Sequence, residues 1–283
     1  MIGVKEIINI KDIVGITKMK HNIILYTLSY NESDIVEYSI DYWKRLGVDK
    51  VICYDNYSTD DTVEKLKKYD WIEVRYFKTD GMTDDLHAII KNNCWKEQKG
   101  KENTYVVVCD FDEYLYFPSG VEATLDKMDG RFSVLGCKWF ALCNDDTPER
   151  IEGVLLHEQS NKFYLQDVNR NYPELGKFML INPNMIDDMG WSVGNHICNP
   201  TGDFKLYVAP IEECVAIHIN KGFSPKYFVE KRKRMAKRLS NLNKMKGYCF
   251  EYNFPEEKSL EEYENNQKKS FDLNECFNSH NKS

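Results

Sequence analysis

The stretch Thr104-Tyr-Val-Val-Val-Cys-Asp-Phe-Asp-Glu-Tyr114 decides the fold of this chain. Residues 104–109 form an apolar, β-branched run, which is typical of a buried strand. Asp110 and Asp112 follow directly and form the only Asp-x-Asp in the chain. Because side chains alternate along an extended strand, both carboxylates fall on one side and Phe111 on the other. The stretch therefore predicts a buried strand whose end carries two carboxylates able to share a divalent ion, with a solvated turn as the alternative.

The residues before this stretch alternate between strand and helix patterns. A regular strand-helix alternation predicts an α/β fold with a central mixed, mostly parallel sheet and flanking helices. The predicted strands are 22–29, 50–54, 71–77 and 104–109, and the predicted helices are 34–46, 60–69 and 83–97.

The composition of the chain supports a globular protein and excludes several classes. The 283 residues are 42% hydrophobic and 29% charged, enough for one large α/β domain or a domain with an appendage. The net charge of −7 argues against a nucleic-acid partner. The N-terminus has no secretory pattern, no apolar run is long enough to span a bilayer, and none of the nine cysteines forms a Cys-x-x-Cys pair. We therefore expect a cytoplasmic protein with reduced thiols.

The basic residues gather in one C-terminal segment. Residues 226–246 contain nine Lys or Arg and one acid, a local charge of +8, so that the rest of the chain carries −15. Phe228, Met235, Leu239 and Leu242 fall at helical spacings there, which predicts an amphipathic helix with a basic outer face. Such a face is either solvated or contacts an anionic membrane surface or a diphosphate. We divide the chain into a domain of residues 1–222 and a helical appendage of residues 223–283, with a short helix expected around 259–269.

Polar residues also follow the other predicted strands. Glu32 lies just beyond the first strand, and Asp55 and Asn56 follow the second. Ligands of parallel α/β sheets bind beyond the carboxyl ends of the strands, so these side chains are candidates for a shared site. An acidic rim of this kind suits a cation, hydroxyl and amide groups, or an anion delivered with a divalent metal. The neighbouring residues 58–61 would alternatively cap the next helix.

Absent motifs narrow the chemistry further. No two of the 15 glycines are two positions apart, which excludes a Gly-x-Gly-x-x-Gly dinucleotide loop, and neither Gly-Lys pair is followed by Ser or Thr, which excludes a P-loop. Gly-x-Ser-x-Gly and His-Glu-x-x-His are absent as well, so the hydrolase elbow and the zincin helix are excluded.

Three motifs in order resemble those of the family 2-like glycosyltransferases with the GT-A fold, in the branch with Asp-x-Asp-Glu after the core strand. They are Asn31-Glu32, the run Asp-Asn-Tyr-Ser-Thr-Asp at 55–60, and Asp-Phe-Asp-Glu at 110–113. The resemblance spans roughly residues 21–233. It implies a GT-A (Rossmann-like) fold and an inverting transfer of a sugar, by default from a UDP-hexose, to a saccharide or glycoconjugate acceptor. It also implies Mn²⁺ or Mg²⁺ as the cofactor.

The resemblance also assigns site residues by position. Asp112 and His218 would bind the metal together with Asp110, which also lies near the ribose, and His196 is the rival third ligand. The implied nucleotide-binding residues are Thr27, Asn31, Glu32, Asp55, Asn56, Asp85 and Asp110.

An inverting transfer needs a carboxylate that takes the proton of the acceptor hydroxyl. Asp145 and Asp146 are the favoured pair because they closely follow the apolar run 132–142, a predicted strand. Asp187 and Asp188 are the alternative pair for this role. Asp145 and Asp146 could instead form only a polar turn before Pro148.

Two other functions are consistent with the same motifs. One is a catalytically inactive GT-A module that binds nucleotide sugars, which the intact carboxylates at three strand ends disfavour. The other is a phosphatase of the haloacid dehalogenase type, which also has Asp-x-Asp after an apolar strand. Tyr114 stands where that class has Thr or Val, which disfavours it. Peripheral contact with the inner membrane face through residues 226–246 is a further expectation, and the oligomeric state is left open.

Overall fold

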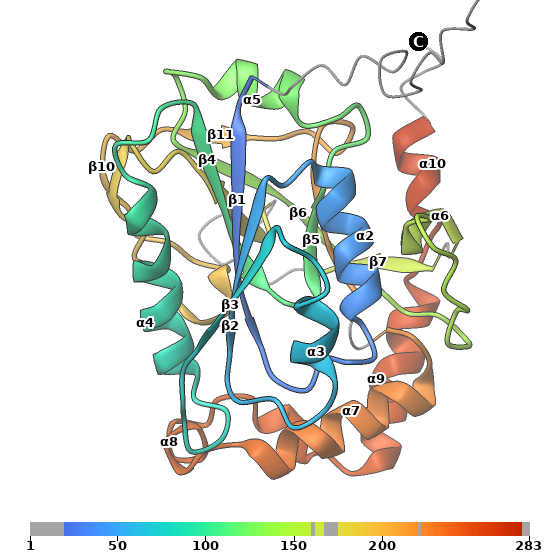
Figure 1. The fold of residues 1–283 in the computed structure, drawn as a ribbon. Helices are drawn as coiled ribbons and strands as arrows, with labels where there is room; N and C mark the ends of the chain where they lie inside the picture. The colour runs from blue at the N-terminus through green and yellow to red at the C-terminus, as the bar shows by residue number, and fades with distance from the viewer. Residues whose placement is uncertain (1–19, 160–161, 167–174, 220–221, 279–283) are drawn as a thin grey trace, which may run out of the picture.

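A central ten-stranded sheet organises the protein (Figure 1). The computed structural model describes residues 20–159, 162–166, 175–219 and 222–278. Eight strands follow the order β3-β2-β1-β4-β8-β6-β12-β5, and β7 and β11 both pair with β6. The strands are β1 (Asn22–Ser29), β2 (Lys50–Asp55), β3 (Ile72–Tyr76), β4 (Thr104–Asp110), β5 (Glu113–Tyr116), β6 (Val134–Leu142), β7 (Phe163–Leu165), β8 (Lys177–Ile181), β11 (Leu206–Val208) and β12 (Val215–His218).

The sheet has a parallel half and a mixed half. Strands β3, β2, β1 and β4 are parallel neighbours, as the strand-helix alternation predicts. In the other half β8 runs antiparallel to β4 and β6, β7 antiparallel to β6, and β5 antiparallel to β12, whereas β6, β11 and β12 are parallel. The predicted α/β class with a mixed, mostly parallel sheet, flanking helices and following C-terminal helices is confirmed.

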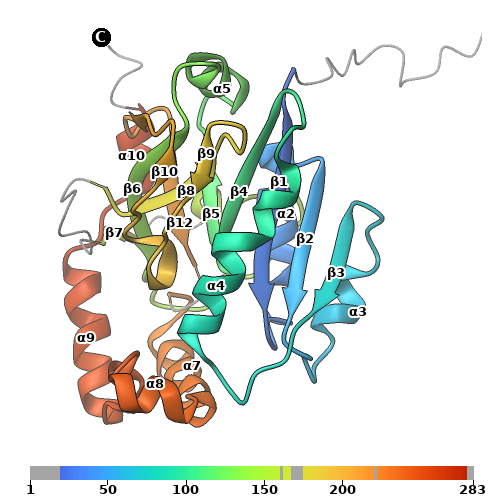
Figure 2. The same cartoon turned by 90° about the vertical axis from the view of Figure 1, so that its left-hand side faces the viewer.

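Helices cover both faces of the parallel half, where α2 and α4 lie on opposite sides (Figures 1 and 2). Alternate residues of β4 pack into two different hydrophobic clusters. Val107 belongs to the cluster that includes the buried residues of α2, and Val106 belongs to the cluster that includes Trp95. Both faces of the strand are therefore buried, which explains its continuous apolar run. The helices before β12 are α2 (Val36–Leu46), α3 (Thr62–Leu66), α4 (Asp84–Cys94), α5 (Glu122–Met128) and α6 (Leu156–Gln159), with short 3-10 turns η1 (Trp95–Gln98) and η2 (Val193–Asn195) and a small hairpin of β9 (Ile186–Asp188) and β10 (Thr201–Gly202).

The C-terminal segment is helical but begins with two helices where one is predicted. The predicted helix over 226–246 is interrupted at Leu239, where the backbone leaves the helical conformation. Ser240 has an extended backbone and caps the second helix by accepting the N–H of Asn243. The helices are α7 (Pro225–Arg238), α8 (Asn241–Lys246), α9 (Glu256–Lys268) and α10 (Leu273–Asn278), with the 3-10 turn η3 (Phe250–Asn253) between α8 and α9. Figures 1 and 2 show α7 and α8 at the end of the molecule toward which β1 and β2 run, and Figure 2 shows them on the side of α9.

Candidate active site

A cleft of about 730 Å³ opens at the carboxyl ends of β1, β4 and β12. Its walls come from these strand ends, from α4 and from the C-terminal helices, so segments far apart in sequence meet there. The charged and imidazole side chains that line it are Glu32, Asp84, His87, Lys91, Asp110, Asp112, Glu113, Lys177, His196, His218, Lys231, Arg232, Arg238, Glu251, Glu262 and Lys269.

Two of the predicted metal ligands meet in this cleft. The pairing of β5 with β12 sets His218 opposite Glu113, and the Nε2 atom of His218 lies 3.1 Å from Oδ2 of Asp112. The N–H of Ile219 donates to the Asp112 carbonyl, which fixes the turn between β4 and β5 against β12. Both side chains are 13% exposed, and the ring of Trp139 stacks on the imidazole. A carboxylate oxygen and an imidazole nitrogen are thereby held side by side at the cleft.

Asp110 contacts a lysine from α4. The Nζ of Lys91 lies 2.6 Å from Oδ1 of Asp110, and the lysine side chain is 3% exposed against 37% for the carboxylate. Burial acts to raise the pKa of Asp110, but the ammonium groups of Lys91 and Lys177 outweigh it and hold this pKa below its usual value. Asp110 is therefore a carboxylate that already faces a positive charge.

Glu113 forms a buried ion pair on the other side of the motif. Its Oε1 lies 2.6 Å from Nζ of Lys177, and neither side chain is more than 4% exposed. The same ammonium donates to the Gly194 carbonyl and lies 4.6 Å from the centre of the Trp139 ring. These contacts join β8 to β5 and β6 behind the cleft.

His196, the rival metal ligand, lies beside Lys177 and does not replace His218 at Asp112. Its Nδ1 is 3.0 Å from the Gly176 carbonyl, and its Nε2 is 3.4 Å from Nζ of Lys177. Burial, followed by the charge of Lys177, lowers the pKa of His196 to about 3, so the ring is neutral at physiological pH.

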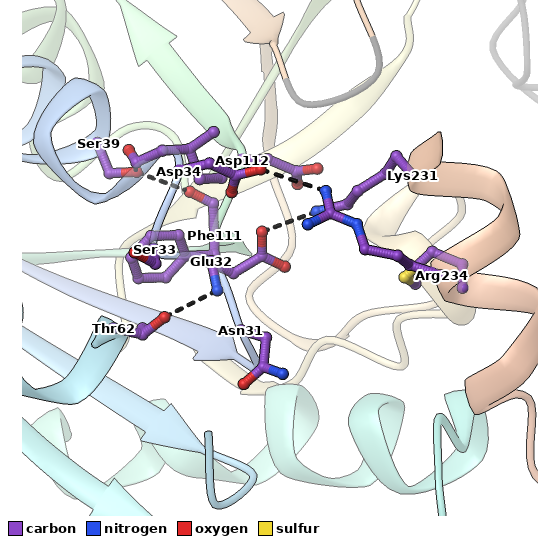
Figure 3. Close-up of polar contacts among 12 residues, drawn as sticks. Asn31, Glu32, Ser33, Asp34, Ser39, Thr62, Phe111, Asp112, Lys231 and Arg234 are labelled. Carbon is purple, nitrogen blue, oxygen red and sulfur yellow. Dashed lines mark hydrogen bonds and ion pairs between the residues drawn. The ribbon is translucent and has the colours of Figure 1, made fainter. Parts of the chain in front are cut away.

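The loop after β1 contacts α7 through charged side chains (Figure 3). Nζ of Lys231 lies 2.9 Å from Oε2 of Glu32, and Arg234 contacts Asp34 at 3.2 Å. Burial raises the pKa of Glu32 to about 7, although the Lys231 ammonium opposes this shift. The C-terminal helix thus closes one wall of the cleft.

The prediction of a basic outer face on this helix is wrong for its central residues. Lys231 and Arg232 are buried, and Arg232 pairs with Glu262 at 2.7 Å. The guanidinium of Arg238 lies 3.5 Å from the centre of the Tyr30 ring, also within the cleft lining. Acidic groups from distant segments draw these side chains inward, which no local pattern reveals. The contacts do not support a membrane-facing role, and no helix in the described part of the chain is long and apolar enough to cross a bilayer.

The predicted nucleotide-binding residues lie at this end of the sheet, but several are tied into its loops. Asp55 is fully buried and accepts hydrogen bonds from Ser29 and Ser58. Asn31 contacts Thr59 through its side chain, and Thr27 is buried within β1. Their predicted role in nucleotide binding stays a prediction.

Two further predicted residues behave differently. Asn56 lines the cleft, and its side chain hydrogen-bonds to Thr79. Asp85 lies outside the lining and pairs with Lys246 at 2.6 Å, while its neighbour Asp84 lines the cleft. Successive side chains of a helix point about 100° apart, which explains why Asp84 lines the cleft and Asp85 does not.

The structure does not bring the predicted base to the cleft lining. Asp145 is 64% exposed, contacts Lys162 and accepts a hydrogen bond from Gln267. Asp146 is exposed beside it, and neither belongs to the lining. The alternative pair also lies outside the lining, and Asp187 and Asp188 contact Lys99 and Lys96.

Sequence reasoning missed the buried lysines of the cleft, Lys91 and Lys177. A weak signal for Lys91 exists, because Asp84, His87 and Lys91 recur at three and four residues and so share one face of α4. A polar stripe on a helix expected to pack against a sheet is unusual and indicates a cleft.

No protein-family model matches the chain, and no curated protein matches it significantly. Solved structures align with it at low identity. A mannosyltransferase from Pyrobaculum calidifontis in complex with GDP-Man and Mn²⁺ is 11% identical over 87% of this chain and 73% of its own, with a TM-score of 0.39. GalNAc-T7 with UDP, GalNAc and Mn²⁺ is 11% identical over 93% of this chain and 56% of its own, with a TM-score of 0.37.

A third solved structure aligns as well. The 4-diphosphocytidyl-2C-methyl-D-erythritol synthase from Anaerococcus prevotii is 15% identical over 58% of this chain and 70% of its own, with a TM-score of 0.32. The TM-scores of all three alignments are below 0.5. These alignments assign neither family 2 membership nor an activity.

We expect Lys177→Met to lower the free energy of unfolding by about 3 kcal/mol, because it leaves the Glu113 carboxylate buried without its partner. Urea denaturation followed by circular dichroism measures the loss. Lys205→Met is the control, since it removes an exposed pair with Asp203 and should change stability far less. Equal effects of the two substitutions would contradict the structural role of the buried pair.

Proposed function

We propose that this protein is a metal-dependent glycosyltransferase that moves a sugar, by default from a UDP-hexose, to a saccharide or glycoconjugate acceptor with inversion. The observation that carries the proposal is the contact of Asp112 with His218 at the cleft. Carboxylate and imidazole ligands from two different strands lie there beside a cleft large enough for a nucleotide sugar.

The residues present fit a divalent ion. A mixed oxygen and nitrogen ligand pair suits Mn²⁺, and carboxylates also suit Mg²⁺. Asp112 and His218 would hold the ion, and Asp110 is available two residues upstream. When bound, the ion would supply positive charge against the diphosphate that leaves as the anomeric bond breaks.

The C-terminal helix supplies the next part of the proposed donor site. Lys231 and Arg238 line the cleft on the side of Glu32 and Tyr30, within the same wall. Lysine and arginine side chains bind phosphate oxygens through charge-assisted hydrogen bonds. These two groups would orient the diphosphate, and their positions are fixed beforehand by contacts with the body of the protein.

The nucleotide would lie over the ends of β1 and β2. Asn56 reaches the cleft directly, while Asp55 and Asn31 hold the two loops in register.

Asp145 or Asp146 stays the predicted base of an inverting transfer. The division into residues 1–222 and 223–283 also stays a prediction, and under this proposal the second segment completes the site of the first.

Asp112→Asn should reduce Mn²⁺-dependent hydrolysis of nucleotide sugars by about a hundredfold or more, because it removes the charged ligand of the metal. Release of the nucleoside diphosphate measures the rate. Asp203→Asn is the matched control, since that exposed carboxylate lies outside the cleft lining, and it should keep the wild-type rate. A wild-type rate in Asp112→Asn would refute the metal assignment.

Lys231→Met should abolish the rise in melting temperature that a nucleotide sugar with Mn²⁺ causes in the wild type, because a phosphate contact is lost. Screening UDP-, GDP- and CMP-linked sugars by thermal shift identifies the donor first. Lys233→Met is the control two residues along the same helix, where the side chain is exposed and pairs with Glu256. If both variants respond like the wild type, Lys231 has no part in donor binding.

A further inference from the structure

The cleft continues past the proposed metal ligands onto the strands beside β12. The register places Ala141 of β6 opposite His218 of β12, and Tyr164 of β7 opposite Ala141. Residues opposite each other on paired strands point to the same face of a sheet, and all three line the cleft. His218 and Tyr164 therefore stand two strands apart, roughly 10 Å by the usual strand spacing, with only the methyl group of Ala141 between them.

Polar side chains extend this face of the sheet along β7. Gln166 lies opposite Trp139, because its N–H donates to the Trp139 carbonyl, and both residues line the cleft. The Nε2 of Gln166 donates to the Tyr164 hydroxyl at 2.7 Å. Amide and hydroxyl groups both donate and accept hydrogen bonds, as the hydroxyl groups of a saccharide require. The cleft beyond His218 is thus lined by an aromatic ring and by groups suited to saccharide hydroxyls.

The end of α9 forms a neighbouring wall of this part of the cleft. Phe163 and Phe271 exchange two backbone hydrogen bonds, which hold the chain after α9 against β7. Glu262, Asn266 and Lys269 follow one another at four and three residues, so they share one side of the helix and its C-terminal cap, and all three line the cleft. A polar helix face and the polar end of β7 therefore border the same space.

Lys269 differs from the other cationic side chains of the lining. Four of the other five pair with a carboxylate and the fifth stacks on an aromatic ring, and they are Lys91, Lys177, Lys231, Arg232 and Arg238. Among the residues that the structure describes, none pairs with or hydrogen-bonds to the ammonium of Lys269. Glu262 on the same side of α9 is already paired with Arg232. This part of the cleft therefore carries a positive charge that no nearby acid offsets.

We propose that the part of the cleft bordered by Tyr164, Gln166, Asn266 and Lys269 is the acceptor subsite and takes a saccharide that bears a carboxylate, a uronic acid. The Lys269 ammonium pairs with the carboxylate, and the amide and phenol groups bind the ring hydroxyls. One ammonium matches one negative charge, which favours a carboxylate over a phosphate group with about two charges. The inference rests on the proposed function in taking the bound saccharide as the acceptor.

The test compares two probes that differ only at C6, methyl β-D-glucuronide and methyl β-D-glucoside. Their dissociation constants for the whole chain are measured by ligand-observed NMR titration at low ionic strength, where an ion pair is least screened. The glucuronide should bind about fivefold more tightly than the glucoside, the gain expected from one ion pair at an exposed lysine. Lys269→Met should bind the two probes equally, because the ammonium is lost.

Two further variants separate the charge from the hydroxyl contacts. Lys268→Met is the matched control and should keep the preference, since Lys268 is exposed, lies outside the lining and contacts Asn265. Gln166→Leu should weaken the binding of both probes by about threefold and leave their ratio unchanged, because it removes an amide and not a charge.

Equal binding of the two probes by the wild type would overturn the inference, and so would binding of neither probe. A preference for the glucuronide that persists in Lys269→Met would also overturn it, because the charge would then be recognised elsewhere. The proposed function fails separately, if no nucleotide sugar releases nucleoside diphosphate with Mn²⁺ present. That release needs no acceptor, and the binding of the two probes needs neither a donor nor Mn²⁺.

Discussion

The antiparallel pairing of β5 with β12 is the constraint on which the site depends. Its register sets His218 opposite Glu113 and so brings the imidazole to Asp112 across 106 residues of sequence. A shift of one residue would turn His218 to the opposite face of the sheet. The parallel pairing of β12 with β6 reinforces the register, because Trp139 of β6 stacks on the same imidazole.

Balanced charge is the second condition for this site. Acidic side chains gather at the carboxyl ends of the strands, and like charges in a partly buried site repel one another. The lysines that offset them come from other elements, with Lys91 on α4, Lys177 on β8 and Lys231 on α7. The same lysines join α4, the mixed half of the sheet and the C-terminal helices around one cleft. Packing and electrostatics therefore support the same arrangement.

The sequence predicted the parts of this arrangement that follow from local pattern. The apolar run 104–109 and its two carboxylates lie at the centre of the sheet as expected, and His218 contacts Asp112. Lys91 and Lys177 escaped prediction because a buried lysine and a solvated one look alike in a single sequence. Their burial depends on acids contributed by distant strands.

Other parts depend on orientation, which local patterns specify poorly. Asp84 lines the cleft in place of Asp85 because the start of α4 determines which side chain points inward. Lys231 and Arg232 point inward because Glu32 and Glu262 meet them, although the charge pattern alone predicted an outer basic face. Asp145 follows the predicted strand, as expected, but its side chain lies outside the cleft lining.

The most direct test of a metal-dependent transferase is nucleoside diphosphate release from a panel of nucleotide sugars, with Mn²⁺ present or removed by a chelator. The account predicts release from at least one donor that stops when the metal is removed and returns when Mn²⁺ is restored. Release that continues at the same rate without metal, or none from any donor with Mn²⁺ present, would contradict it.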